Sequence, residues 1–427
     1  MKTLFLSILF CLSIQIGHSQ QRNLDYYIAQ AQTNSPLLNK NRNDNKLINL
    51  DLAQVQRALS KPEINLEANV LFAPIIAHNN NSNSLEWVSS GATSYSGYDL
   101  STSDGGQYQA VVAITQPLFN ASKFRAYSDK SAVLSHQNEN STMLTIHEIE
   151  QLVSYQYVLC LKSKLQVENG FSLYTELKSQ LPIMKKLVEN ALYKHSDLML
   201  LQLEIQNYEF DYQTFLANHR TNIYDLNLLC GIKDTTIVDI QQVDFQIKSL
   251  LPTSSKFLNS FKLDSLNVVS DLIISNLKYK PQLSLFANAG LNAVYQPTFN
   301  RMGFSTGITF SWNLFDGNQR GIQNQKSLIS LQSIEFQKNN FITQNEINRG
   351  KILNQINSLN QQTSLLQEQL NQYNKLRNTY EKELSQGEIS VMDFKNFMKD
   401  IASKQQQFLM LKIEKLMLIN SYNYWNF

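Results

Sequence analysis

Two similar stretches, about half the chain apart, constrain the fold of this sequence more than any other feature. Residues 114–120 read ITQPLFN, and residues 310–317 read FSWNLFDG. Each stretch closes an alternating apolar and polar segment with Leu-Phe. An Asn or Asp suited to capping a helix follows, ahead of a long segment almost without proline. We interpret both as strand-to-helix junctions, and such self-similarity predicts an internal duplication.

The first residues have the features of an export signal. Lys2 is followed by an apolar run from Leu4 to Ile16, and Gly17 and Ser19 are small residues suited to cleavage. We therefore predict a signal peptide over residues 1–19 and an exported mature protein. No later segment approaches the roughly 20 apolar residues of a membrane-spanning helix, so none is predicted.

Charge, histidine and cysteine content exclude several classes of partner and site. The chain has 37 Lys and Arg against 35 Asp and Glu, which gives no reason to expect a nucleic-acid partner. The histidines lack metal-ligand spacing, and no phosphate loop or nucleophile elbow is present. We therefore predict no metal, no cofactor and no enzymatic activity. Beyond the signal, Cys160 and Cys230 are compatible either with a bridge between antiparallel helices or with two unpaired core thiols.

The first half, residues 20–234, is predicted to contain a helix, two strands and a helical hairpin. Helical spacing of apolar residues extends from residue 24 to 60, with a break near Pro36. After Pro62 the period becomes two, which predicts strands at about residues 63–73 and 107–118, each with one apolar face. Residues 74–106 are rich in Asn, Ser and Gly and are expected to form an exposed loop. A hairpin at about 119–230 follows, interrupted near Pro182.

The second half repeats this order after a linker over residues 235–254. In residues 255–427 we predict a helix ending at Lys280-Pro281, strands at about 281–293 and 303–314, and a hairpin at about 316–425. Apolar and aromatic residues recur every seven positions in that hairpin, which predicts a coiled-coil seam. The seam consists of Ile352, Leu359, Leu366, Tyr373 and Tyr380, with Ile356 and Leu370 between them.

The four strands allow two interpretations. A soluble sheet packed on helices would leave helices of roughly 100 Å without a sheet large enough to lie against. Alternatively, the apolar face points outward into lipid, and the strands then belong to a closed barrel, because an open edge leaves backbone groups unsatisfied in hydrocarbon. Four strands cannot close alone, but three chains would supply about twelve.

The order of these motifs resembles the TolC-like outer membrane efflux protein family over essentially the whole mature chain. The matching motifs are Asn34-Ser35-Pro36, Lys61-Pro62, Gln116-Pro117-Leu118-Phe119-Asn120, Lys280-Pro281, Leu314-Phe315-Asp316-Gly317 and Gln386-Gly387-Glu388-Ile389-Ser390. The resemblance implies an α+β membrane protein whose coiled-coil hairpins and four strands per chain form a homotrimer. That trimer would have a twelve-stranded β-barrel and a helical periplasmic tunnel.

The resemblance also implies a function and a location. Such a protein lies in the outer membrane of a Gram-negative bacterium, in contact with lipid, and extends into the periplasm. It is the exit duct of a tripartite efflux or type I secretion system, and it works with a periplasmic adaptor and an inner-membrane pump. Small molecules or polypeptides pass through it passively. The alternative is a periplasmic coiled-coil adaptor or structural protein of an export complex, although adaptors carry one hairpin between compact β domains.

The resemblance finally assigns three groups of residues. Alignment on Gly387 places Asp393 and Asn396 at the pore constriction, where the family has acidic residues; a solvated surface aspartate is the alternative for Asp393. The helical tips that would contact the adaptor comprise Gly387, Glu388, Ile389, Ser390, Tyr193 and Ser196. The barrel-to-tunnel junction comprises Pro117, Leu118, Phe119, Trp312, Leu314 and Phe315. The junction aromatics would form either an interfacial belt or part of the core, and Pro117 is expected to end the strand ladder.

Overall fold

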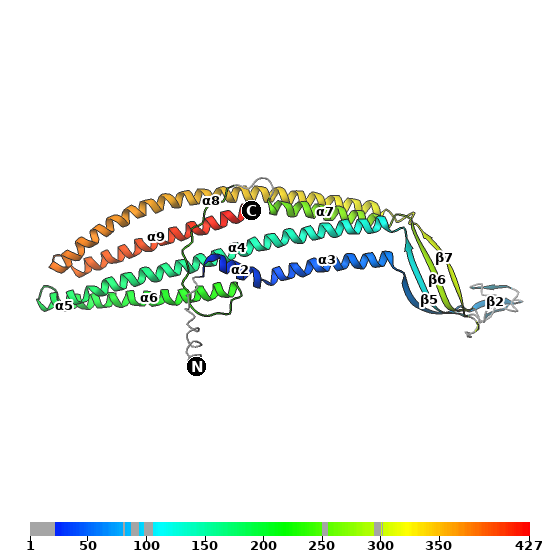
Figure 1. The fold of residues 1–427 in the computed structure, drawn as a ribbon, viewed down its shortest axis with the longest axis horizontal. Helices are drawn as coiled ribbons and strands as arrows, with labels where there is room; N and C mark the ends of the chain where they lie inside the picture. Colours follow the sequence, from blue (N-terminus) through cyan, green and yellow to red (C-terminus); the bar gives the residue numbers. More distant parts are fainter. Residues whose placement is uncertain are drawn as a thin grey trace, which may run out of the picture. The chain divides into compact units, whose positions relative to one another are not determined.

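The computed structural model describes residues 22–79, 82–86, 94–97, 106–249, 255–293, 300 and 302–427. The predicted signal peptide therefore lies outside the described residues. Figure 1 shows the helices and strands of the chain, which divides into two compact units. Unit 1 comprises Met1–Asn41, Asn140–Ser260 and Gln337–Phe427, and unit 2 comprises Arg42–Glu139 and Phe261–Phe336. Each unit thus combines segments from both halves of the sequence.

The first helical segment is two helices, α2 (Leu24–Asn34) and α3 (Pro36–Ser60). Ser35, which separates them, is extended with ψ 120°, the conformation favoured before a proline. Pro36 is the first residue of α3, where its missing amide hydrogen costs no helical hydrogen bond. The Ser35 hydroxyl accepts a hydrogen bond from the Leu38 amide at 3.3 Å. The sequence Ser-Pro therefore ends one helix and caps the next.

The main sheet is antiparallel and has the strand order β1-β5-β6-β7. Its strands are β1 (Glu63–Phe72), β5 (Gly106–Leu118), β6 (Gln282–Ala293) and β7 (Met302–Ser311). The register aligns the apolar positions of all four strands, as in the row Leu66, Val112, Ala289 and Phe304. Because alternate residues point to opposite sides of a sheet, one face is mainly apolar, with Gln116 and Thr306 as polar exceptions, and the other is mainly polar.

β7 is shorter than the predicted strand at 303–314. Gln282, the first residue of β6, already pairs with Ser311. No partner in this sheet remains for residues 312–314, which are not in a strand.

The loop predicted over residues 74–106 is wrong where the structure describes it. Three strands, β2 (Ile75–Asn79), β3 (Ser82–Glu86) and β4 (Ser94–Ser96), form a second sheet with the order β3-β2-β4. Ile75 and Ala77 of β2 are buried. A strand as short as β2 has few inward-facing positions, so two apolar residues are enough to give it a buried face. The Asn and Ser content of the segment concealed this alternation.

The hairpin of the first half contains α4 (Ala121–Ser179), α5 (Leu181–Glu189) and α6 (His195–Leu229). The interruption between α4 and α5 lies at Gln180. Pro182 occupies the first turn of α5, where a residue needs no amide donor. The second half contributes α7 (Lys256–Leu277), α8 (Gln319–Gln386) and α9 (Val391–Trp425). None of the described helices is long and apolar enough to cross a bilayer.

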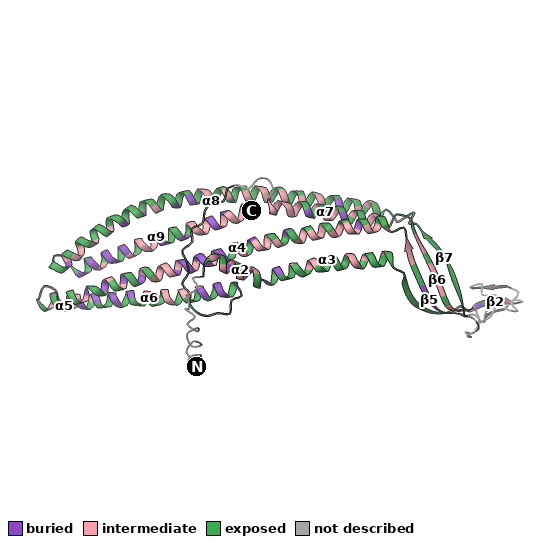
Figure 2. Cartoon of the chain, in the orientation of Figure 1, coloured by how far each residue is buried: buried purple, intermediate pink, exposed green. Residues whose placement is uncertain are grey.

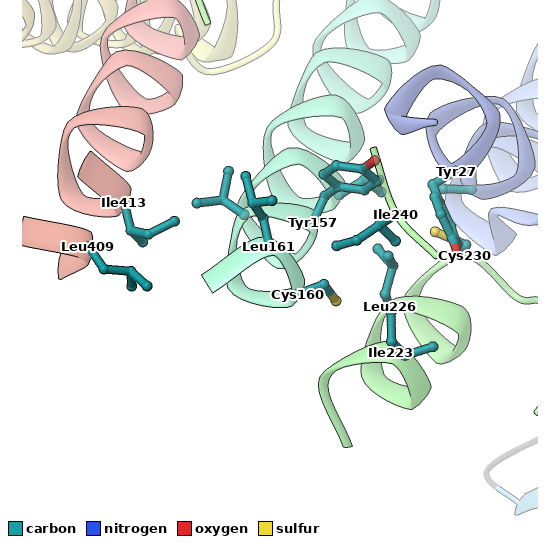
Figure 3. Packing of buried hydrophobic residues seen from close by; sticks show 13 residues of the cluster. Tyr27, Tyr157, Cys160, Leu161, Ile223, Leu226, Cys230, Ile240, Leu409 and Ile413 are labelled. Atoms are coloured by element: carbon teal, nitrogen blue, oxygen red, sulfur yellow. The ribbon is translucent and has the colours of Figure 1, made fainter. Parts of the chain in front are cut away.

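One hydrophobic core of unit 1 joins α2, α4, α6 and α9 with the segment after α6 (Figure 3). Its fully buried side chains include Tyr157, Ile240, Cys160 and Cys230, and the Tyr157 hydroxyl donates to the Gln241 carbonyl at 2.8 Å. Both cysteines are free, so the unpaired alternative is the one the structure supports. Burial raises the pKa of each thiol to about 12.

A charged contact ties the start of the described chain to the segment after α6. The Arg22 guanidinium donates to the Asp234 carboxylate at 2.5 Å. The amide and hydroxyl of Thr236 donate to the same carboxylate at 2.9 Å. The hydrogen bonds from Thr236 and then from Arg22 lower the pKa of Asp234 to about 2.

The predicted seam of α8 faces α9. Ile352 and Ile356 cluster with Ile419 and Tyr422 of α9. Nearer the C-terminal end of α8, the Tyr380 ring stacks on Phe397 with 4.6 Å between ring centroids. Figure 2 shows buried residues recurring along α8 and α9, whereas the strands of the main sheet are largely exposed or intermediate.

Candidate functional site

The first strand-to-helix junction lies at the end of β5. Pro117 pairs with Ser284, and the ladder continues to Leu118, so the expectation that Pro117 ends the ladder is wrong. Beyond Thr115, β5 no longer pairs with β1, and a proline is tolerated where one side of a strand needs no donor. Phe119 then turns the chain with φ 56°, a left-handed conformation that is uncommon for a residue with a side chain.

The junction is held to α3 by its capping residue. The Asn120 side chain donates to the Leu59 carbonyl at 2.8 Å. The Asn120 carbonyl accepts from the Phe124 amide at 2.9 Å and so begins α4. One asparagine therefore starts α4 and binds the end of α3.

The second junction follows β7 and is organised by Tyr279. The Trp312 ring nitrogen donates to the Tyr279 carbonyl at 3.2 Å. The Asp316 carboxylate accepts from the Tyr279 hydroxyl at 2.5 Å and from the Arg320 amide at 2.9 Å. The bond from Tyr279 lowers the pKa of the Asp316 carboxyl, because it favours the charged form.

Four of the junction residues are unusually exposed apolar side chains. The exposed fractions are 86% for Phe119, 88% for Phe315, 78% for Leu314 and 53% for Trp312. None of them therefore belongs to the core of this chain. Large exposed apolar groups can mark a surface that meets another apolar environment.

The two helical tips end their helices in the same way. In the second tip, Gly387 has φ 77°, its amide bonds to the Leu384 carbonyl at 3.1 Å, and the Glu388 amide bonds to the Glu383 carbonyl at 2.8 Å. This is the Schellman pattern that closes a helix with a left-handed residue. In the first tip Ala191 has the left-handed role, with φ 61°. The methyl group of alanine makes that conformation costly.

The tips of the two hairpins contact each other through Tyr193. Its hydroxyl donates to the Ile389 carbonyl and lies 3.4 Å from the Leu384 carbonyl. A Cβ atom at Gly387 would lie 3.8 Å from the Cβ of Leu192, so the two turns pack closely. Glu388, Ser390 and Ser196 are exposed.

Two ion pairs and a hydrophobic cluster also join the hairpins. Arg377 of α8 lies 3.2 Å from Glu176 of α4, and Lys395 of α9 lies 3.1 Å from Glu204 of α6. Burial raises the pKa of Glu176, and Arg377 opposes this shift. The cluster consists of Leu173, Leu177, Met184, Leu198, Leu201, Ile205, Tyr208, Leu384, Val391, Phe394, Phe397, Met398 and Ile401.

The candidate constriction residues Asp393 and Asn396 are exposed near the start of α9. The Ser390 hydroxyl donates to the Asp393 carboxylate at 2.6 Å and accepts from the Asp393 amide at 3.1 Å. Asp393 therefore has a helix-capping role that we did not predict. The spacing Ser-x-x-Asp before an apolar run was the signal that could have shown it.

The sequence alone does not reveal the residues that join the hairpins. The resemblance places Tyr193 at a tip, but its contact with Ile389 and the pair Lys395 and Glu204 appear only in the structure. Their partners are far apart in the chain, and no local pattern marks such pairs. Among the described residues, no group of His, Cys, Asp and Glu is arranged to hold a metal ion.

Comparison with solved structures identifies the fold. The outer membrane channel CmeC of Campylobacter jejuni aligns with 96% of this chain and 86% of its own length, at 13% identity and a TM-score of 0.69. The outer membrane protein VceC of Vibrio cholerae aligns over 94% and 96%, at 13% identity and 0.68. CusC aligns over 95% and 92%, at 12% identity and 0.71. No family model and no curated protein matches the sequence.

Proposed function

We propose that this chain, which has the fold of the TolC-like outer membrane channels, is itself an outer membrane channel. In this proposal three copies form the exit duct of a tripartite efflux or type I secretion system in a Gram-negative bacterium. The duct passes small molecules or polypeptides from the periplasm to the exterior without chemistry of its own. A periplasmic adaptor and an inner-membrane pump supply the cargo.

The apolar face of the main sheet carries this proposal. Its large side chains are exposed in the single chain, by 78% at Leu66, 75% at Val70, 87% at Phe304 and 65% at Ile308. Soluble proteins rarely expose a continuous apolar surface of this kind. Lipid is the environment in which such a face is stable.

The free edges of the sheet support the trimer. Among the described strands, β1 and β7 are the outer strands of this sheet, and each pairs on one side only. In hydrocarbon an unpaired edge leaves backbone donors and acceptors unsatisfied, so the edges must be closed. Pairing β7 of one copy with β1 of the next closes a ring, and three copies give the roughly twelve strands suited to a water-filled barrel.

The opposite face of the sheet is suited to a water-filled interior. Polar side chains that share this face include Glu63, Asn65, Glu67, Asn69, Gln109, Asn288, Ser305 and Thr309. Glu63 and Glu67 are the charged residues in the four strands. In a trimer they would give the interior a negative potential.

The exposed tips are the surface that we propose for the adaptor. Gly387, Glu388, Ser390 and Ser196 are exposed, and Ile389 is intermediate.

In the trimer, Asp393 would contribute to an acidic constriction, with Asn396 one turn further along. The variant Asp393→Asn separates the role of Asp393 in the constriction from its role in the helix cap. Asparagine keeps an acceptor for the hydrogen bond from the Ser390 hydroxyl but loses the negative charge. If the constriction is acidic, Asp393→Asn reduces block of the channel by multivalent cations, whereas Ser390→Ala retains it.

Membrane fractionation and bilayer recording test the function as a whole. We expect the protein in the outer membrane fraction as a heat-labile trimer, and we expect the purified trimer to conduct ions across planar bilayers. A periplasmic adaptor would not be extracted from the outer membrane as such a trimer. A soluble, non-conducting protein would overturn the proposal.

A further inference from the structure

A pocket of about 380 Å³ lies where the apolar face of the main sheet ends. Leu118, Leu283 and Phe310 occupy one row across β5, β6 and β7, and all three line the pocket. They belong to the apolar face, because this row lies an even number of residues along the strands from the row that contains Leu66. The pocket therefore has an apolar wall that continues the face we propose for lipid.

Two lysines line the same pocket. Lys123 comes from the first turn of α4, and Lys280 comes from the segment just before β6. Within the described part of the chain, neither forms an ion pair. The start of α4 also carries the partial positive charge of a helix N-terminus. Two lysines from distant parts of the sequence thus line one pocket with an apolar wall, and no acidic side chain is among its described lining residues.

The surroundings of the pocket are basic as well. The four segments that flank the sheet at this end are residues 57–63, 119–125, 276–282 and 312–320, and we call them the junction collar. They contain two acidic residues, Glu63 and Asp316, and seven basic ones: Arg57, Lys61, Lys123, Arg125, Lys278, Lys280 and Arg320. The whole chain is nearly balanced, with 37 basic and 35 acidic residues. The excess of positive charge is therefore local to the collar.

We propose that this pocket binds the headgroup of an anionic phospholipid from the adjoining membrane leaflet. The phosphate lies between Lys123 and Lys280, and the acyl chains follow the apolar wall toward the face of the sheet. Charge complementarity accounts for the headgroup, since a basic residue near an anionic membrane surface attracts it. Because the pocket also has an apolar lining, it suits the acyl chains of a lipid, which a soluble anion lacks. This inference rests on the proposed outer membrane location.

A second copy of the chain does not account for the pocket. Its strand residues come from β5, β6 and the adjoining edge of β7, and β5 and β6 are interior strands of the sheet. The edges available for pairing with other copies are β1 and the far side of β7. Trimer closure by strand pairing thus leaves this row uncovered on its apolar side.

Lipid binding by the purified full-length protein in neutral detergent tests the inference. Native mass spectrometry would count bound molecules during titration with phosphatidylglycerol, with phosphatidylcholine and with inorganic phosphate. The test variant is Lys123→Gln/Lys280→Gln. The matched control is Lys46→Gln/Lys326→Gln, which removes the same charge from exposed helical positions that do not line the pocket.

We expect phosphatidylglycerol to bind in preference to phosphatidylcholine. Removal of both pocket lysines should weaken its binding about 25-fold, at about five-fold per lysine, whereas the control should bind like the wild type. Equal binding by the test and control variants would overturn the inference. So would inorganic phosphate that binds as tightly as the lipid, because the site would then be one for a soluble anion.

Membrane fractionation of the same variants distinguishes failure of the lipid-site inference from failure of the proposed function. If the wild-type protein is absent from the outer membrane, the proposed function fails and the lipid site fails with it. If the wild type is an outer membrane trimer but the pocket variant keeps its phosphatidylglycerol, only the lipid site is refuted.

Discussion

Removal of the Tyr193 hydroxyl should loosen the contact between the two helical tips. In Tyr193→Phe the ring stays, but the hydrogen bond to the Ile389 carbonyl and the weaker contact with Leu384 at 3.4 Å are lost. Ile389 is only partly buried, so water can replace the lost donor and no full desolvation penalty applies. A neutral hydrogen bond then contributes about 1 kcal/mol net, which corresponds to a roughly five-fold shift in the equilibrium between joined and separated tips.

Hydrogen exchange measured by mass spectrometry can detect this change locally. Amides in residues 187–197 and 384–394 should exchange about five-fold faster in Tyr193→Phe, with unchanged exchange in the core around Tyr157. The matched control is Tyr174→Phe, because the Tyr174 hydroxyl contacts Lys178 within the same helix at 2.8 Å. The reasoning is refuted if the tips of Tyr193→Phe exchange like the wild type, or if Tyr174→Phe has the same effect.

Four further outcomes are expected. Ala191→Gly should stabilise the protein by up to about 1 kcal/mol in denaturant unfolding, because glycine adopts the left-handed conformation without strain; a destabilised variant would contradict this. Glu67→Gln should lower the ratio of cation to anion permeability of the channel, and an unchanged reversal potential would count against a lumen-facing carboxylate. The lowered pKa of Asp234 means that its contribution to stability is present above its unfolded pKa of about 4 and is lost as the pH falls through about 2. Asp234→Asn should therefore be less thermostable than the wild type at pH 7, and the difference should shrink as the pH falls toward 2 and vanish below it. Cys160 and Cys230, with pKa values of about 12, should resist iodoacetamide at pH 8 until the protein is unfolded; labelling of the native protein would show that the core opens.

Local patterns in the sequence anticipated most of the elements. Periodicity of two and of 3.6 depends on neighbouring residues alone, and proline acts on its own backbone and on the residue before it. The helix break at Ser35-Pro36 and the start of β1 after Pro62 could therefore be read directly. The seam residues of α8 were also visible, because their sevenfold spacing is a property of one helix.

Other features depended on what each element meets in the fold. β7 ends at Ser311 because β6 begins at Gln282, a limit that the sequence of β7 does not contain. Strands β2 to β4 were missed because a short strand in a polar segment carries too few apolar residues for a period to be visible. Asp393 also contacts Ser390 in a helix cap, and its place at a constriction stays a prediction.

The sequence by itself determined the order of the long helices and of the four strands of the main sheet, the apolar and the polar face of each of these strands, and the two junctions at which a strand leads into a long helix. The tertiary structure alone decided the register that joins four apolar strand faces into one, the contact of Tyr193 with Ile389, and the pocket between Lys123 and Lys280. The physical reason is that periodicity is a local property of the chain. The register of β5 with β6, the hydrogen bond between the two tips and the pair of lysines around one cavity each depend on segments separated by more than a hundred residues.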